Sequence, residues 1–336
     1  MKILHILPEF QEGGVERHVL WLSNELAVTG HDVTLISAGG KLEENLKGVR
    51  HINLPVHRKN PGTGIYSAIR IARYMKNEKV DIIHAHSRVP AWIAWWASSL
   101  SGVPWIATCH AFYSRNAGLI PYGHARHLIC VSDSVRAYMA SLFPKARFTV
   151  LYNGLPELPF SWHPPADGPV RLLFVGRLTA KKGLRTDLES LSSFAGGDWV
   201  FDIVGDGPKM DSMKELIHSL NLEKQVFFHG FQDVPEKWME KCSCFLFPSL
   251  EEGMGLTLMR AIQMGVPVIS SDLPAVRELA VTGEGLLLPG RVESWREEFS
   301  KVLKKESYPW THFDKSKIPT TGDMAKKTEE IYSDFL

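Results

Sequence analysis

This chain of 336 residues has few cysteines and almost no net charge. It has four cysteines, and its 38 basic side chains against 37 acidic ones give a formal net charge of +1. Cysteines without metal-site or disulfide spacing exclude a disulfide-stapled scaffold and are typical of buried thiols in a reducing compartment. A charge near zero supplies no overall field that attracts nucleic acid, so we expect no nucleic-acid partner.

Long hydrophobic runs are also missing. The apolar run after Met1 is too short for a signal peptide. Residues 89–109 carry no charge over about the length of a membrane span, but Pro90, Gly102 and Pro104 divide them into a tryptophan-rich helix and a short strand. We therefore expect this segment to be core and the protein to be cytoplasmic.

Strand and helix signals alternate on both sides of one proline-rich segment. Five prolines within residues 155–169 can continue neither a helix nor a central strand, so this segment is the expected linker. The alternation predicts an α/β fold with two Rossmann-like, doubly wound domains facing across a ligand cleft. We expect an N-terminal domain over residues 1–160, a C-terminal domain over residues 161–310, and an end segment, residues 311–336, packing back on the first domain.

The expected elements follow from apolar periodicity and turn residues. The strands are predicted at residues 3–7, 33–37, 52–56, 80–85, 105–108, 128–131, 148–152, 171–175, 200–204, 225–229, 244–247, 267–270 and 285–288. The helices are predicted at residues 15–29, 65–76, 90–100, 133–142, 184–194, 210–220, 256–264 and 322–336.

The stretch from Pro248 to Val266 carries the strongest chemical signal. A buried strand end is followed by two carboxylates, a glycine pair around Met254 and a helical pattern that starts at Leu256. A strand, a glycine turn and a helix N-terminus form a cradle for an anion, because free N–H groups and the helix dipole point out of it. With Glu252 at its mouth, the cradle indicates a hydroxyl-rich ligand that carries phosphate, such as a nucleotide sugar.

Three more loops follow predicted strands. Arg177, Lys181 and Lys182 lie between Gly176 and Gly183, and these cations could neutralise a pyrophosphate without a metal. The Gly205-Asp-Gly207 turn is explained equally well by a tight turn and by close approach of a ligand. The same alternatives stay open for Gly13-Gly14, which precedes the first helix.

Histidines mark the strand ends of the first half. His84 and His86 share one face of an extended segment, an arrangement that can bind metal. No third ligand occurs at useful spacing, so no metal site is predicted. His110, just past another strand end, is the better candidate for contact with substrate.

The order and spacing of these loops resemble those of the retaining, GT-B-fold nucleotide-sugar transferases of glycosyltransferase family 4, which include many bacterial envelope and capsule enzymes. The likeness covers nearly the whole chain and rests on Gly13-Gly14, His84-Ala-His86, Asn153-Gly154, Gly176-Arg177, Lys182-Gly183, the Gly205 turn and Pro248–Gly253. The resemblance implies transfer from a nucleoside diphosphate sugar, a UDP-sugar in preference to a GDP-sugar, to a glycan or lipid-linked acceptor with retention of configuration. It also implies that the domain over residues 1–160 binds the acceptor and that the domain over residues 161–310 binds the donor. It implies no cofactor and no metal.

The resemblance also implies residue roles. Arg177 and Lys182 hold the donor diphosphate, Glu252 contacts sugar hydroxyls, and His110 lies near the sugar and the acceptor hydroxyl; these four are the catalytic candidates. The full donor set is Gly14, Arg177, Lys182, Gly205, Phe231, Glu252, Gly253, Met254, Gly255, Leu256 and Arg260. The acceptor set is Gly13, His86 and His110.

Arg260 departs from the family pattern. The family has a second glutamate at this position, where its carboxylate accepts hydrogen bonds from the ribose, and a guanidinium can only donate. Three accounts compete: Arg260 turns to solvent while another acceptor takes the ribose, it contacts phosphate or an unusual nucleotide, or the protein has lost catalysis and kept sugar binding. A synthase with a small soluble acceptor is a further alternative.

Trp92, Trp95 and Trp96 lie on one predicted helix, and the segment Arg70–Lys79 is basic. Tryptophan favours membrane interfaces, which motivates the hypothesis of peripheral contact with the inner face of a membrane; three tryptophans on one helix are also typical of a protein core. The oligomeric state is not predicted.

Overall fold

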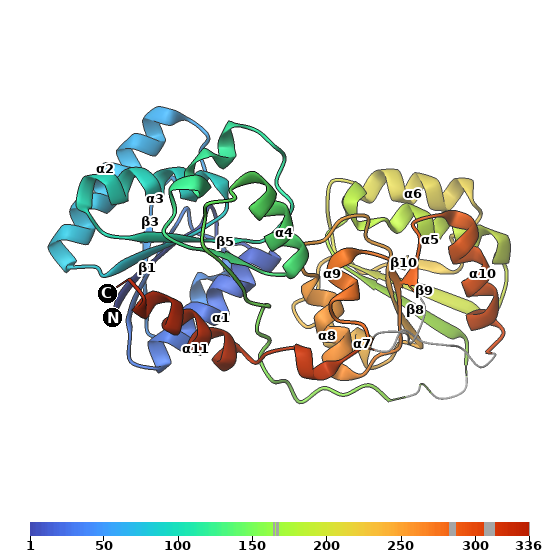
Figure 1. Cartoon of the computed structure of the whole chain (residues 1–336). Helices are drawn as coiled ribbons and strands as arrows, with labels where there is room; N and C mark the ends of the chain where they lie inside the picture. Colours follow the sequence, from blue (N-terminus) through green and yellow to red (C-terminus); the bar gives the residue numbers. More distant parts are fainter. Residues whose placement is uncertain (164, 166–167, 282–286, 306–312, 336) are drawn as a thin grey trace. The chain divides into compact units, whose positions relative to one another are not determined.

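The computed structural model describes residues 1–163, 165, 168–281, 287–305 and 313–335 (Figure 1). The chain forms two compact units. Met1–Glu157 and Pro319–Leu336 make up the N-terminal unit, and Leu158–Ile318 make up the C-terminal unit. Each unit has its own parallel sheet with helices, so the predicted α/β fold with two Rossmann-like domains is confirmed.

A seven-stranded parallel sheet forms the centre of the N-terminal unit, in the order β3-β2-β1-β4-β5-β6-β7. Its central strands are buried along most of their length, as expected for a parallel sheet covered on both faces. The strands are β1 (Lys2–Ile6), β2 (Asp32–Ser37), β3 (Val49–Asn53), β4 (Ile82–His86), β5 (Trp105–Cys109), β6 (Leu128–Cys130) and β7 (Phe148–Val150).

The helices of this unit start at recognisable caps. The Asn60 side chain accepts a hydrogen bond from the Thr63 amide, and the Ser132 hydroxyl accepts one from Val135, so each satisfies an otherwise free N–H group. The helices are α1 (Gly14–Val28), α2 (Pro61–Glu78), α3 (Arg88–Ser101), α4 (Asp133–Leu142) and α11 (Thr321–Ser333).

Helix α11 belongs to the N-terminal unit although it comes from the end of the chain. It lies beside α1 (Figure 1), and Met324, Ile331 and Tyr332 join the apolar cluster that contains Leu22 and Ile82. The last helix therefore completes the core of the first unit.

The C-terminal unit contains a six-stranded parallel sheet in the order β10-β9-β8-β11-β12-β13. Its strands are β8 (Val170–Val175), β9 (Trp199–Val204), β10 (Val226–Phe228), β11 (Cys244–Phe247), β12 (Val268–Ser271) and β13 (Leu287–Leu288). Its helices are α5 (Leu184–Leu191), α6 (Met210–Ser219), α7 (Glu236–Met239), α8 (Leu256–Met264), α9 (Pro274–Arg277) and α10 (Val292–Leu303).

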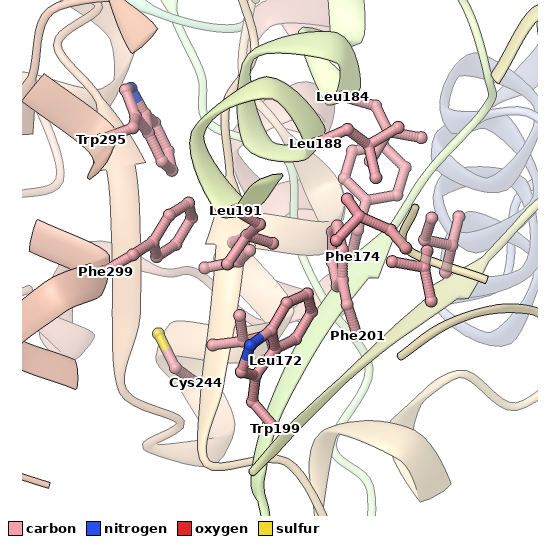
Figure 2. Close-up of a cluster of buried hydrophobic side chains, with 14 of the residues drawn as sticks. Leu172, Phe174, Leu184, Leu188, Leu191, Trp199, Phe201, Cys244, Trp295 and Phe299 are labelled. Carbon is pink, nitrogen blue, oxygen red and sulfur yellow. The ribbon is translucent and has the colours of Figure 1, made fainter. Parts of the chain in front are cut away.

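Helix α10 packs on α5 and closes the core of this unit. Figure 2 shows Trp295 and Phe299 of α10 facing Leu191 of α5, with Cys244 of β11 nearby. All four cysteines of the chain are buried and free, in agreement with the prediction. Among the described residues, no helix combines the length and apolarity needed to cross a bilayer.

Several predicted boundaries were wrong. The strand expected at residues 52–56 lies at Val49–Asn53, and the helix expected at residues 184–194 ends as α5 at Leu191 and continues as a short 3-10 turn. Helices α7, α9 and α10 were not predicted. The strand expected at residues 285–288 lies partly outside the described residues, as does part of the linker.

Candidate active site

The loops after β8, β9, β10 and β11 all leave the same edge of the C-terminal sheet, because these strands are parallel. This edge carries the donor-site candidates of the C-terminal unit from Arg177 to Leu256, whereas Arg260 lies further along α8. An ion pair between two loops and close packing of the loop backbones fix the structure of this edge.

An ion pair joins the β8 loop to the β11 loop. The Lys182 ammonium contacts the Glu252 carboxylate, which also accepts a hydrogen bond from the Ser249 hydroxyl at 2.9 Å. Both ion-pair side chains are largely buried, with 26% of Lys182 and 13% of Glu252 exposed. The neighbouring pair, Lys181 with Glu251, joins the same two loops but is 65% and 40% exposed. A partly buried pair is screened less by salt than an exposed one.

Two glycines let these loops approach each other closely. Gly205 has φ +137°, and a Cβ there would overlap the carbonyl oxygen of Gly176. Gly183 has φ +71°, and a Cβ there would overlap the carbonyl oxygen of Pro248. The packing of loop on loop therefore requires glycine at both positions, which supports the turn interpretation of Gly205.

Alanine at Gly183 is expected to lower the unfolding free energy of the C-terminal unit by about 2–3 kcal/mol, since the residue combines a left-handed conformation with a backbone clash. Gly196→Ala is the matched control: Gly196 has φ +78°, but open space surrounds its Cβ position. Urea denaturation of both variants separates the clash from the cost of positive φ. Equal losses in the two variants would contradict the clash.

Helix α8 begins where the β11 loop ends. Gly253, Met254 and Gly255 are buried, and Leu256 is the first helical residue. A Cβ at Gly255 would overlap the ring of Phe247, so glycine is needed for the helix to start over this ring. The first-turn N–H groups of α8 have no acceptor within the helix, and such groups can bind an anion.

Two donor candidates are exposed at the same edge. Arg177 follows β8 and is exposed. Phe231 follows β10 and is 39% exposed. An exposed guanidinium can bind a phosphate, and an exposed aromatic ring can stack on a base.

Arg260 does not turn to solvent, so the first of the three accounts of this residue is wrong. It lies on α8 with 6% of its surface exposed, and its Nε is 3.1 Å from a carboxylate oxygen of Glu236 on α7. Glu236 is 8% exposed. The guanidinium also contacts Gln263 one turn along α8. Sequence reasoning missed Glu236, because a four-residue helix gives no periodic signal.

In the N-terminal unit, five histidines from three elements and one loop gather at the sheet. The His5 Nδ1 atom of β1 is 3.0 Å from Nε2 of His86 of β4, whose Nδ1 is 3.2 Å from Nε2 of His110. The His18 ring of α1 lies edge-on to His110 with 4.8 Å between centroids. His84 bonds Tyr332 of α11 and Thr108, both at 2.7 Å.

Burial keeps these rings neutral at pH 7. It lowers the pKa of His5 to about 3 and that of His18 to about 4, and it holds the pKa values of His84, His86 and His110 well below the usual range. Repulsion from neighbouring histidines adds to the lowering at His5, His84, His86 and His110. A neutral ring can both donate and accept a hydrogen bond, as contact with a sugar hydroxyl requires.

The sequence argument found no third metal ligand near His84 and His86, and the structure corrects it. His5 joins these two, and His18 and His110 form a second group with His86; within each group one ligand atom per residue lies within 4.8 Å of the others. The rings of His84 and His86 already form hydrogen bonds with neighbouring side chains. The absence of a metal from the reaction stays a prediction.

The remaining N-terminal candidates lie at the start of α1. Gly13 is the N-cap residue, and its carbonyl accepts the first helical hydrogen bond from Arg17 at 3.0 Å. Gly14 is the first helical residue and is exposed. His18 lies one turn further along α1, so the glycine turn and this member of the histidine cluster belong to the same end of the helix.

Two family descriptions match the two units in turn. "Glycosyltransferase Family 4" matches residues 12–157, and "Glycosyl transferases group 1" matches residues 160–315. The chain belongs to glycosyltransferase family 4. It is a glycosyltransferase with the GT-B fold, as its motifs indicated.

This glycosyltransferase is similar to several enzymes and to solved structures. It is 25% identical to the GPI3 subunit of phosphatidylinositol N-acetylglucosaminyltransferase from Saccharomyces cerevisiae over 97% of this chain and 80% of that one. It is 26% identical to glycogen synthase from Mycobacterium tuberculosis over 84% and 81%. The crystal structure of Anabaena HepE with UDP-glucose has the same fold, with a TM-score of 0.83, 17% identity, and 99% and 100% coverage.

Proposed function

We propose that this glycosyltransferase moves a sugar from a nucleoside diphosphate sugar, a UDP-sugar in preference to a GDP-sugar, to a glycan or lipid-linked acceptor with retention of configuration. The observation that carries the proposal is the Lys182–Glu252 pair beside the N-terminus of α8. It sets a cation for phosphate and a carboxylate for sugar hydroxyls next to free backbone N–H groups.

Donor binding is assigned to the C-terminal edge. Lys182 and Arg177 neutralise the diphosphate, and the first-turn N–H groups of α8 bind its oxygens. Glu252 accepts hydrogen bonds from the donor sugar, and Phe231 lines the base. These cations carry the charge that a divalent ion would otherwise supply, so the proposed reaction needs no metal.

In the transfer step, the departing phosphate of the donor acts as the base, and a histidine of the N-terminal unit orients the reacting groups. The acceptor hydroxyl attacks the anomeric carbon on the face from which the nucleoside diphosphate leaves, and the departing phosphate takes the hydroxyl proton. Neutral His110, held by His86 at 3.2 Å, orients the sugar and the acceptor hydroxyl. Lys182 and Arg177 stabilise the negative charge that develops on the leaving group.

Relatives support a donor of this kind and an envelope role. HepE was crystallised with UDP-glucose, and WclY of Escherichia coli, 28% identical over 45% of this chain, is an O-antigen biosynthesis glycosyltransferase. We place the reaction in the cytoplasm, at the inner face of the membrane, where lipid-linked acceptors are presented.

Lys182→Ala is the direct test of the donor site. We expect release of UDP from UDP-glucose or another UDP-sugar to fall about 100-fold or more, because the developing phosphate charge loses a largely buried cation. Lys181→Ala is the matched control, since its ion pair with Glu251 is exposed, and it should retain most of the activity. Equal losses in both variants, or none, would contradict the assignment.

The alternative is a sugar-binding relative without catalysis, favoured by Arg260 at the place of the family's second glutamate. Thermal shift with UDP and GDP, followed by assay of nucleotide release from their sugars, separates the two functions. Stabilisation by a nucleotide without release from any donor sugar supports the silent relative.

A further inference from the structure

A pocket of about 590 Å³ opens in the N-terminal unit at the starts of α2 and α3. Three cationic side chains line it: Arg58 and Lys59 just before α2, and Arg88 at the start of α3. Among the described residues that line it, none carries a carboxylate. A concave surface lined by positive charges concentrates a positive potential inside the pocket.

Two helix starts add to this potential. Pro61 and Gly64 of the first turn of α2 line the pocket, as do Arg88 and Val89 of the first turn of α3. Both helices are longer than a dozen residues, and the positive ends of their dipoles favour an anion. The helix starts and the cations therefore favour the same kind of ligand.

The backbone is strained at the same place. Ser87, which lines the pocket before α3, has φ 88° and ψ 163°, a region populated almost only by glycine. Its side chain does not cap the helix, so no cap hydrogen bond offsets the strain. Strained backbone of this kind is concentrated at ligand sites.

Aromatic side chains form the apolar wall. Trp92 and Trp96 line the pocket, with 5.3 Å between their ring centroids, and both are partly exposed. A Cβ at Gly64 would lie 3.0 Å from the Trp96 ring, so α2 packs directly on this indole and fixes it. A fixed indole face beside cations suits a ligand with a ring next to its charge.

We propose that this pocket binds the phosphate group of a phosphorylated acceptor, with the ring that carries the phosphate lying against Trp96 and Trp92. The ligand class is a sugar or cyclitol phosphate, either free or as the headgroup of a lipid. Its designation as acceptor rests on the proposed function; the pocket is lined by the N-terminal unit, whereas the donor loops belong to the C-terminal unit.

The test measures binding to the full chain by calorimetry without any donor. Glucose 6-phosphate is compared with glucose, and vesicles of phosphatidylinositol in phosphatidylcholine are compared with phosphatidylcholine alone. Binding of the sugar phosphate identifies a free ligand, binding of the phosphatidylinositol vesicles identifies a headgroup, and either supports the proposal if Arg88→Gln weakens it tenfold or more. No binding to either phosphate probe overturns it.

Substitutions at exposed positions distinguish a loss of binding from a loss of folding. Arg58 and Lys59 are exposed, so the double variant Arg58→Gln/Lys59→Gln should fold and should also weaken binding tenfold or more. Arg73→Gln is the control, because Arg73 is exposed on α2 but does not line the pocket. Equal weakening by Arg73→Gln, or none by the double variant, overturns the proposal. Phosphate binding with no release of UDP from any donor would instead count against the proposed function alone.

Discussion

Replacing Arg260 with alanine is expected to lower the unfolding free energy of the C-terminal unit by about 3–5 kcal/mol, because it leaves the Glu236 carboxylate buried without its ion-pair partner. Glu236 is only 8% exposed, and its oxygen lies 3.1 Å from Arg260 Nε. Urea denaturation followed by tryptophan fluorescence and circular dichroism measures the loss. This is a large part of the stability of a domain of this size.

Arg277→Ala provides the control for this prediction. Arg277 also pairs with a carboxylate, that of Asp272, but its side chain is 67% exposed, so its removal should change stability little. The double variant Arg260→Met/Glu236→Met should recover most of the loss, because it removes both buried charges together. If Arg260→Ala were as stable as Arg277→Ala, the buried pair would contribute nothing.

The same pair changes the expected effect of restoring the family's glutamate. Arg260→Glu would place a second carboxylate against Glu236 in a buried site, where like charges repel strongly. We therefore expect Arg260→Glu alone to lower stability and not to tighten UDP or GDP binding.

The N-terminal unit is expected to lose stability steeply as the pH falls from about 6.5 towards 4. The unfolded histidines take up protons near pH 6.5, whereas burial keeps the folded pKa of His18 at about 4 and that of His5 at about 3. The unfolded state then binds more protons, and stability falls with decreasing pH across this window. Above pH 6.5 the contribution is fully present. Each ring contributes up to about 3 kcal/mol.

A single substitution tests this mechanism. His5→Gln should reduce the slope of unfolding free energy against pH between 4 and 6 by about 1.4 kcal/mol per pH unit, the effect of one proton. His124→Gln removes an exposed ring of the same unit and should leave the slope nearly unchanged. If both variants kept the wild-type slope, the acid sensitivity would arise outside the histidine cluster.

Local patterns predicted the elements of the donor site well. The strand at Cys244–Phe247 and the helix at Leu256–Met264 match the predicted bounds, because an apolar run, a glycine turn and Gly265 with φ +81° delimit them. The strand at residues 52–56 was misplaced because Leu54 and Val56 are apolar and buried without being in the sheet. Pairing with β2 ends at Asn53, and sequence alone does not reveal where pairing ends.

The contacts that decide the site were less accessible to sequence reasoning. His5, His18, His86 and His110 are far apart in the chain and meet only because β1, β4 and α1 are neighbours in the fold. The partner of Arg260 lies on a helix too short to show a period. The loops were predicted because glycine and charge are local signals, whereas the buried pairs and the cationic pocket depend on tertiary packing.

Helix α11 affects the order in which the two units can finish folding during synthesis. Tyr332 bonds His84 in the core of the N-terminal unit, so that unit lacks an internal piece until the ribosome has synthesised the whole of the C-terminal unit. The C-terminal unit is one uninterrupted segment, Leu158–Ile318, and can complete its own core first. Synthesis from the N-terminus thus leaves the first unit to be finished after the second, and the histidine cluster is closed only once α11 has followed the C-terminal unit out of the ribosome.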